Sequence, residues 1–125
     1  MKQIISSTHA PKAVGPYSQA IEINGTLYIS GQLPIDPATG AFVEGGAAEQ
    51  TAQCLKNIGA ILRQAGYDYH DVVKSTVLMA DMNDFAVMNS VYARFYNAPF
   101  PARVAYQVAR LPMGALIEIE TIAAK

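Results

Sequence analysis

Two alternating segments near the C-terminus constrain the fold more than any other feature of the chain. Residues 103–109 alternate between polar or small side chains and larger apolar ones, and residues 117–120 alternate between Ile and Glu. Successive side chains of a strand point to opposite faces, so a period of two predicts a β-strand in each segment. The sequence Pro-Met-Gly at 112–114 supplies the break between them. The chain therefore ends in two predicted strands.

These two strands carry side chains that can perform chemistry. If they pair as neighbours, Arg103 and Glu118 approach each other on one face of the sheet. A planar guanidinium binds a carboxylate through two parallel hydrogen bonds, and a Glu carboxylate can orient or deprotonate water. The side chain of Glu120 points to the same face of the strand as that of Glu118, so Glu120 is the alternative candidate for the residue that orients or deprotonates water. An Arg–Glu pair on adjacent strands is also common as a solvated structural pair that contributes little stability.

Composition indicates one globular domain, residues 1–125. Of its 125 residues, 51% are hydrophobic and only 15% are charged, which is enough apolar material for a core and argues against disorder. So low a charge also suggests that another subunit covers part of the surface. The net charge of −1 comes without any basic cluster, which argues against a nucleic-acid partner.

The sequence contains no signal for membrane insertion or secretion, and it has a single cysteine. No apolar run approaches the roughly 20 residues that span a bilayer, and the N-terminus lacks the apolar segment of a signal peptide. The single Cys54 has no partner for an internal disulfide, so we expect a reducing, cytoplasmic location. In the predicted first helix Cys54 is best interpreted as a small buried hydrophobic residue.

Periodicity and turn residues predict the other elements. Asn24 and Gly25, between two apolar-rich segments, indicate a hairpin because both tolerate positive φ. Apolar residues at spacings of three and four predict a helix that Gly66 ends. The predicted order is a strand at 3–6, the hairpin at 18–30, a loop at 33–46, a helix at 47–65, a strand at 72–79, a helix at 84–96 and the two C-terminal strands.

This order predicts an α+β fold, a mixed β-sheet with two helices packed on one face. Strand–helix–strand units favour parallel neighbours and right-handed crossovers, whereas hairpins add antiparallel pairs. The second face of the sheet then needs a cover, because the C-terminal strands hold side chains too apolar for open water. These are Val104, Tyr106, Val108, Ile117 and Ile119.

Several short motifs accompany these strands. They are Gly-Pro-Tyr-Ser-Gln-Ala at 15–20, Ile-Ser-Gly-Gln-Leu-Pro at 29–34, Val-Lys-Ser-Thr-Val at 73–77, Asn-Asp-Phe at 83–85, Pro-Ala-Arg at 101–103, Val-Ala-Arg-Leu-Pro at 108–112 and Ile-Glu-Ile at 117–119. Together they resemble the RidA/YjgF family, the reactive intermediate (enamine/imine) deaminases, over essentially the whole chain. The resemblance implies a chorismate-mutase-like fold, homotrimers with sites in the clefts between subunits, and hydrolysis of 2-imino acids or enamines to 2-oxo acids and ammonia.

The resemblance also implies roles for individual residues. Arg103 would hold the substrate carboxylate, and Glu118 would aim or deprotonate the water. Four further residues match positions of the family that line the site, namely Tyr17, Ser30, Asn89 and Ala105. Many relatives carry Cys where this chain has Ala105, so the chemistry here needs no thiol at that position. Phe85 is interpreted as a core residue.

Other functions stay open as alternatives. A non-catalytic module of the same family would bind a small carboxylate in the same cleft. A ribonuclease or translation inhibitor conflicts with the near-neutral charge, and a chorismate-mutase-like isomerase would favour several convergent Arg side chains. His9 and His70 lack the spacing of metal ligands, and no phosphate-binding loop is present, so neither metal nor cofactor is expected.

Overall fold

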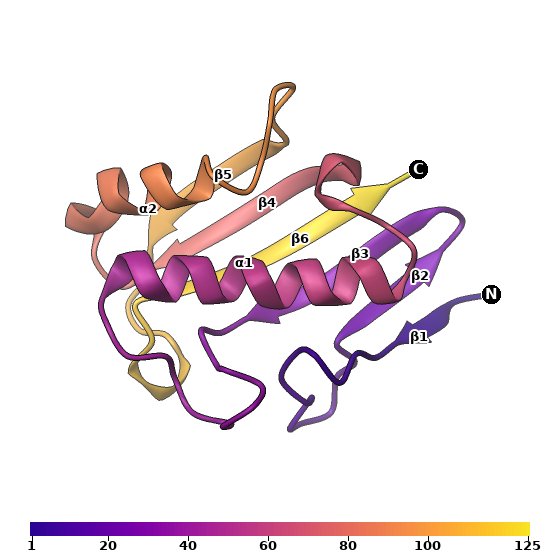
Figure 1. Cartoon of the computed structure of the whole chain (residues 1–125), viewed down its shortest axis with the longest axis horizontal. Coiled ribbons are helices and arrows are strands. Elements are labelled where there is room, and N and C mark those ends of the chain that lie inside the picture. Colours follow the sequence, from indigo (N-terminus) through magenta and orange to yellow (C-terminus); the bar gives the residue numbers. More distant parts are fainter.

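A six-stranded mixed sheet with two helices on one face forms the architecture in the computed structural model, which describes all 125 residues (Figure 1). The predicted α+β fold is confirmed. The strands run in the order β1-β2-β3-β6-β4-β5 across the sheet. The elements are β1 (Gln3–Ile5), β2 (Ala20–Ile23), β3 (Thr26–Gln32), α1 (Ala47–Gln64), β4 (Val72–Met79), α2 (Phe85–Tyr92), β5 (Ala102–Gln107) and β6 (Ile117–Ala124).

The connections explain why the sheet is mixed. β2 and β3 form the predicted antiparallel hairpin, whose turn residues Asn24 and Gly25 have φ of 50° and 76°. Helix α2 links β4 to β5, and these two strands pair in parallel. β6 pairs antiparallel with both β3 and β4, so it lies between the two strands that α1 connects.

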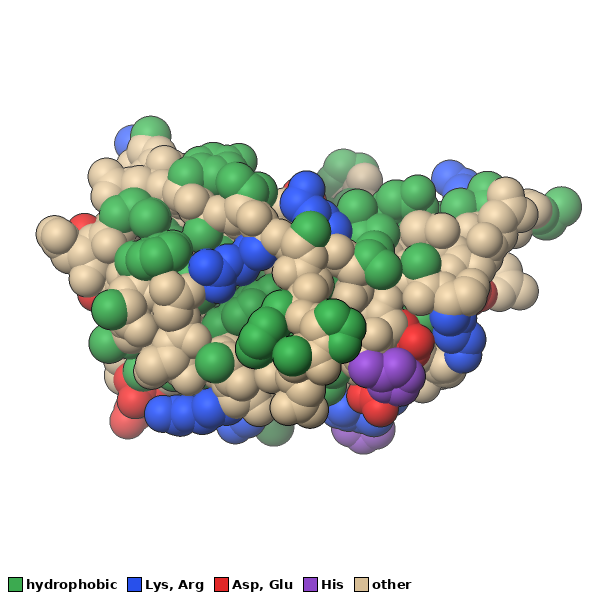
Figure 2. All heavy atoms as spheres, turned by 90° about the horizontal axis from the view of Figure 1, so that it is seen from above, with side chains coloured by type: hydrophobic (Ala, Val, Ile, Leu, Met, Phe, Trp, Pro, Cys, Tyr) green, Lys and Arg blue, Asp and Glu red, His purple; other side chains and the backbone are tan.

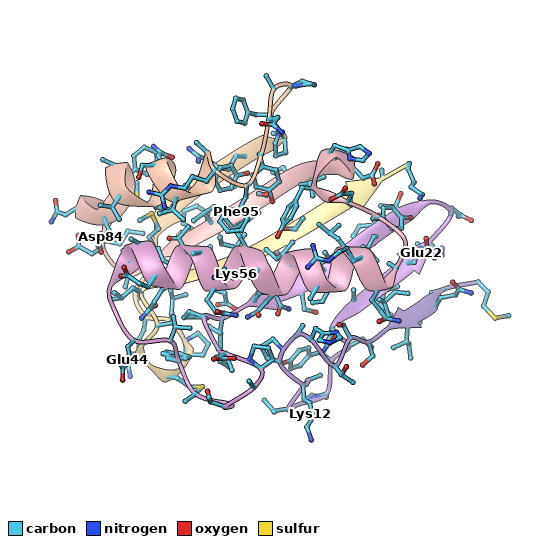
Figure 3. The ribbon with its side chains drawn as sticks, viewed as in Figure 1. Lys12, Glu22, Glu44, Lys56, Asp84 and Phe95 are labelled. Atoms are coloured by element: carbon cyan, nitrogen blue, oxygen red, sulfur yellow. The ribbon has the colours of Figure 1, made fainter.

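The core lies between α1 and the sheet. Leu55, Ile58 and Leu62 occupy the predicted apolar stripe of α1 and have no exposed surface. They face fully buried side chains of the sheet, among them Val77 and Ile119. Cys54 is also fully buried, as predicted, with its Sγ atom 3.7 Å from the carbonyl oxygen of Ile117. In Figure 3 the Phe95 side chain lies beside α1, whereas Glu44 and Asp84 lie at the periphery.

Helix α2 is shorter than the sequence predicts. The expected helix spanned 84–96, but α2 ends at Tyr92. Beyond it the chain tightens into three-residue turns: the Arg94 amide donates to Val91 at 3.0 Å, and the Phe95 amide donates to Tyr92 at 3.1 Å. Tyr96, which follows, is buried. The tighter turns let apolar residues continue into the core without extending the α-helix.

The expectation that Arg103 and Glu118 share one face of adjacent strands is wrong. β4 lies between β5 and β6, and it pairs Ser75 with Arg103 and Leu78 with Glu118. Ser75 is buried beneath the helices, while Leu78 points to the opposite face. Arg103 therefore lies on the helix-covered face and Glu118 on the open face. The cause is the α2 crossover, which returns the chain parallel to β4 at the edge of the sheet.

The apolar residues of the C-terminal strands were expected to lie on one face that another subunit covers, but the structure divides them between the two faces of the sheet. Ile117 and Ile119 are buried beneath the helices. Val104 and Tyr106 lie on the open face, because their register partners Thr76 and Leu78 do, and both are exposed in the single chain. The open face thus keeps an apolar strip without a partner inside one chain.

Truncating the core should test this packing. Ile58→Ala removes a fully buried side chain between α1 and the sheet, so we expect it to lower the free energy of unfolding by about 2–5 kcal/mol. Val87→Ala, at a side chain of α2 that is 45% exposed, should change it far less. Urea unfolding followed by circular dichroism measures both; equal losses would contradict the described core.

Candidate active site

Arg103 stands on the edge strand β5 without an acidic partner. The ion pairs within the chain involve only His70 and its neighbouring Asp residues. The carbon at the centre of the Arg103 guanidinium lies 4.9 Å from the ring centre of Tyr92 and 5.6 Å from that of Phe85. Aromatic ring faces attract a cation without using its N–H groups. The guanidinium is therefore held by α2 while its donor edge stays available.

Around Arg103 the surface forms a hollow of about 470 Å³ between α2 and the segment before β5. It is lined by Asn89, Tyr92, Ala93, Phe100, Pro101 and Arg103. Figure 2 views the molecule from above this edge and shows basic side chains among hydrophobic ones around a depression. A positive group in a partly apolar hollow suits a small carboxylate. We call this hollow the cationic half-site.

Glu118 lies on the open face, in a gap that Gly31 leaves. A Cβ atom on Gly31 would collide with the Glu118 carboxylate where it lies, so any other residue would displace that carboxylate. Gly31 belongs to the irregular stretch of β3 between Ile29 and Gln32, where the pairing with β6 shifts register. Such a bulge re-aims side chains at a sheet edge or a site. The sequence therefore builds a specific niche for this carboxylate.

The environment of Glu118 favours its protonated form. Burial raises the pKa of Glu118 above its ordinary value of 4.5, and the negative charge of Glu120 raises it further. No Lys or Arg of the chain forms an ion pair with Glu118. A carboxylate with a raised pKa is a better proton acceptor than an ordinary surface Glu.

A second hollow, also about 470 Å³, opens next to this niche on the same face. It is lined by Lys2, Pro16, Tyr17, Ser18, Ile21, Tyr28, Ile29, Ser30 and Glu120. The Ser30 hydroxyl donates a 2.6 Å hydrogen bond to the Ser18 carbonyl, which ties β3 to the loop that carries Tyr17. We call Glu118, Glu120, Tyr17 and Ser30 the acidic half-site.

The residues predicted from sequence thus fall into two groups. Asn89 lines the cationic half-site, and Ala105 lies two residues from Arg103 on the same face of β5. Tyr17 and Ser30 lie with the two Glu residues on the open face. Sequence reasoning missed Tyr92 and Phe100 as lining residues. Tyr92 lies at helical spacing from Phe85 in the second predicted helix, which predicts a core position for it, and Phe100 had only its place next to the Pro-Ala-Arg sequence as a signal.

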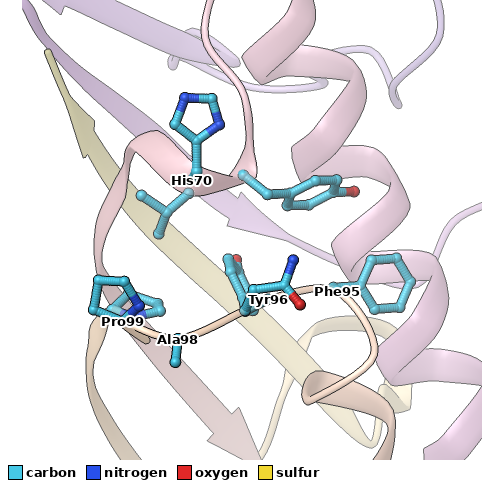
Figure 4. A pocket seen from close by; sticks show the side chains of 9 residues that line it. His70, Phe95, Tyr96, Ala98 and Pro99 are labelled. Atoms are coloured by element: carbon cyan, nitrogen blue, oxygen red, sulfur yellow. The ribbon is translucent and has the colours of Figure 1, made fainter.

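A third hollow contains none of the predicted residues. It has a volume of about 120 Å³ and is lined by Tyr69, His70, Val72, Phe95, Tyr96, Asn97, Ala98, Pro99 and Pro101 (Figure 4). The His70 side chain is 79% exposed. The chain has no group of three or more His, Cys, Asp or Glu that could hold a metal ion. Neither does any of its helices combine the length and apolar character that crossing a bilayer requires.

Nearly the whole chain is similar to proteins of one known family. The model of the family described as Endoribonuclease L-PSP matches residues 7–125. The chain is 53% identical to the 2-iminobutanoate/2-iminopropanoate deaminase of Mus musculus, and the match spans 98% of this chain and 91% of that protein. It is 56% identical to the enzyme of the same name from Bos taurus, over 98% of this chain and 90% of that protein. It is also 56% identical to a RutC family protein of Pyrococcus horikoshii over 100% of the chain and 99% of that protein.

Solved structures agree with these sequence matches. A putative endoribonuclease from Thermotoga maritima superposes with a TM-score of 0.97 at 46% identity, covering 100% of this chain and 98% of that one. TdcF of E. coli, solved with bound serine, superposes with a TM-score of 0.94 at 40% identity, covering 98% of each chain. The fold and most of the sequence are thus shared along the full length.

The raised pKa of Glu118 can be tested by removing its like-charged neighbour. Glu120→Gln deletes the second cause of the shift, so the pKa of Glu118 should fall but stay above 4.5, because burial remains. Carbon-13 NMR titration of the Glu118 carboxyl carbon measures this change. Glu44→Gln, in a distant loop, serves as the control; an unchanged Glu118 pKa in Glu120→Gln would contradict the described coupling.

Proposed function

Because the chain belongs to the Endoribonuclease L-PSP family, which contains the RidA/YjgF proteins, we propose that it is a 2-iminobutanoate/2-iminopropanoate deaminase. Its substrates are reactive 2-imino acids and their enamine tautomers, such as 2-aminoacrylate. The identity of more than half the residues to mammalian deaminases of that name, over 98% of the chain, is the observation that carries this assignment.

The reaction sets three tasks for the site. Water adds to the carbon of the C=N bond, which gives a tetrahedral adduct with a hydroxyl and an amino group. Collapse of that adduct expels ammonia and leaves the C=O bond of a 2-oxo acid, so one imine and one water become one oxo acid and one ammonia. The site must hold the substrate carboxylate, aim the water and move its proton.

Arg103 is suited to the first task. Its guanidinium has no competing acidic partner and lies against aromatic rings that leave its N–H edge free. Two parallel hydrogen bonds from a planar fork fix both oxygens of a carboxylate, and so fix the orientation of the imine carbon. The amide of Asn89, in the same hollow, supplies a further polar contact.

Glu118 is suited to the second and third tasks. Its raised pKa favours accepting a proton from the attacking water, and the same group can then return that proton to the departing nitrogen. Glu120 is more exposed and lies towards Tyr17 and Ser30, where it raises the pKa of Glu118. We assign the base to Glu118 and an electrostatic role to Glu120.

One chain does not bring these groups together, because Arg103 and Glu118 lie on opposite faces of the sheet. The proposal therefore includes a second copy whose open face packs against the β5 edge of the first. Arg103, Asn89 and Ala105 of one copy then meet Glu118, with Tyr17 and Ser30, of the next. The exposed apolar strip of Val104 and Tyr106 gives such an interface something to bury.

A cyclic homotrimer satisfies this geometry. The contact is heterologous, since a different surface is used on each side, and such contacts close into rings when the rotation permits. Three equivalent clefts would result, each shared by two chains. No cofactor is needed, since positioning alone accelerates the addition of water to a reactive imine. The single buried Cys54 and the absence of a disulfide fit a reducing cytoplasm.

The assignment is tested by turnover. The protein is mixed with a dehydratase and serine or threonine, and imine decay and 2-oxo acid release are followed against buffer. Faster release of 2-oxo acid is expected. Binding of 2-oxobutanoate without acceleration would instead indicate a small-carboxylate module, and RNA cleavage without imine turnover would indicate a ribonuclease; either result would overturn the deaminase assignment.

Replacing the guanidinium should separate binding from folding. Arg103→Lys keeps the positive charge but loses the fork, so kcat/KM should fall about 100-fold while the circular dichroism spectrum is unchanged. Arg110→Lys, an exposed Arg beyond β5, is the matched control and should retain wild-type kinetics. Full activity in Arg103→Lys would refute the bidentate role.

The two acidic residues should differ in kinetics and in pH dependence. Glu118→Gln removes the base and should lower kcat at least about 100-fold. Glu120→Gln should retain most activity. Because the base must be ionised, wild-type kcat/KM falls as the pH drops through the raised pKa of Glu118, and Glu120→Gln should move this acid limb to lower pH. Equal losses in both variants would contradict the assignment.

A further inference from the structure

The Arg103 side chain, on an edge strand, is held by aromatic rings and not by an acidic partner. The side chain is exposed, no carboxylate of the chain pairs with it, and a free Arg at such a position samples many rotamers. Its guanidinium nevertheless lies 4.9 Å from the centre of the Tyr92 ring, closer than to Phe85. Tyr92 is therefore the main contact that limits where this cation can lie.

The Tyr92 ring is itself fixed. Only 5% of its surface is exposed, and the ring of Tyr96 packs behind it at a centroid distance of 4.7 Å with a tilt of 36°. Tyr96 in turn packs edge-on against Tyr69 at 5.7 Å. This row of aromatic rings runs from the core to the guanidinium, so the position of Arg103 is coupled to a rigid part of the fold.

The hydroxyl of Tyr92 contributes little to this support. It belongs to a group of four buried hydroxyls, those of Ser75, Tyr92, Tyr96 and Thr121, and none has a well-aligned hydrogen-bond partner. Burial raises the pKa of Tyr92, while the Ser75 hydroxyl and the Arg103 charge oppose that rise. Tyr92 is therefore neutral near pH 7. A buried hydroxyl without a partner lowers stability, so the ring, and not the O–H, is the useful part of this side chain.

We propose that Tyr92 is a positioning residue, whose ring face holds the Arg103 guanidinium in the orientation that receives the substrate carboxylate. The inference rests on the proposed function only in taking Arg103 as the carboxylate holder. The attraction is electrostatic, between the cation and the electron-rich ring face, and it leaves the N–H fork unoccupied. Loss of the ring would leave Arg103 charged but mobile, which weakens binding of carboxylate and raises KM more than it lowers kcat.

The test changes the electron density of the ring while nearly keeping its shape. Tyr92→Phe is the starting variant, and Phe carrying one, two and three fluorine atoms is then placed at position 92. Fluorine withdraws electron density from the ring face and weakens its attraction for a cation. The Kd for 2-oxobutanoate should stay within about twofold in Tyr92→Phe and rise stepwise with fluorine number, to about tenfold. A Kd independent of fluorine number would overturn the proposal.

A second readout needs no ligand. In the wild type the Arg103 Nε–H proton should resonate upfield of its position in a free Arg, because it lies over aromatic rings. Tyr92→Leu should move it back, whereas Tyr67→Leu, at an equally buried Tyr remote from Arg103, should not. An unshifted Arg103 signal in the wild type would refute the positioning role. If the shift is present and 2-oxobutanoate does not bind, the proposed function fails while the ring–guanidinium contact stands.

Discussion

The insertion of β4 between β5 and β6 is the constraint on which the rest of the structure depends. It places the guanidinium of Arg103 and the carboxylate of Glu118 on opposite faces of one sheet. Had they been neighbours, the two charges would neutralise each other inside one chain as an ordinary surface pair. Their separation keeps the cation free and lets burial raise the pKa of the acid. Each half-site therefore lacks the opposite charge within its own chain.

The two faces of the sheet are prepared in different ways. On the helix-covered face, aromatic rings of α2 fix the guanidinium and leave its donors unoccupied. On the open face, Gly31 makes room for the Glu118 carboxylate within an irregular stretch of β3. Exposed Val104 and Tyr106 lie beside β4 on that same face. An interface built on this strip would exclude water from the cleft and strengthen every electrostatic contact inside it.

Local sequence signals predicted local structure well. The Asn24–Gly25 turn, the apolar stripe of α1 and the alternation within each C-terminal strand all act over a few residues, and the structure confirms each of them. Strand order could not be obtained in this way, because a period of two defines the faces of each strand but not which strand lies beside it. The end of α2 was missed for a related reason: burial of Tyr96 overrides helical periodicity. The residues of the site were found by resemblance, while their division between two faces required coordinates.

Mixing two inactive variants tests the shared cleft most directly. Arg103→Lys and Glu118→Gln chains, differently tagged and co-expressed, would assemble together, and the mixed species would be purified through both tags. If each cleft takes Arg103 from one copy and Glu118 from the next, every mixed trimer has one cleft in three with both native residues, so turnover should recover to about a third of wild type. Turnover no higher than that of either parent variant would contradict the account.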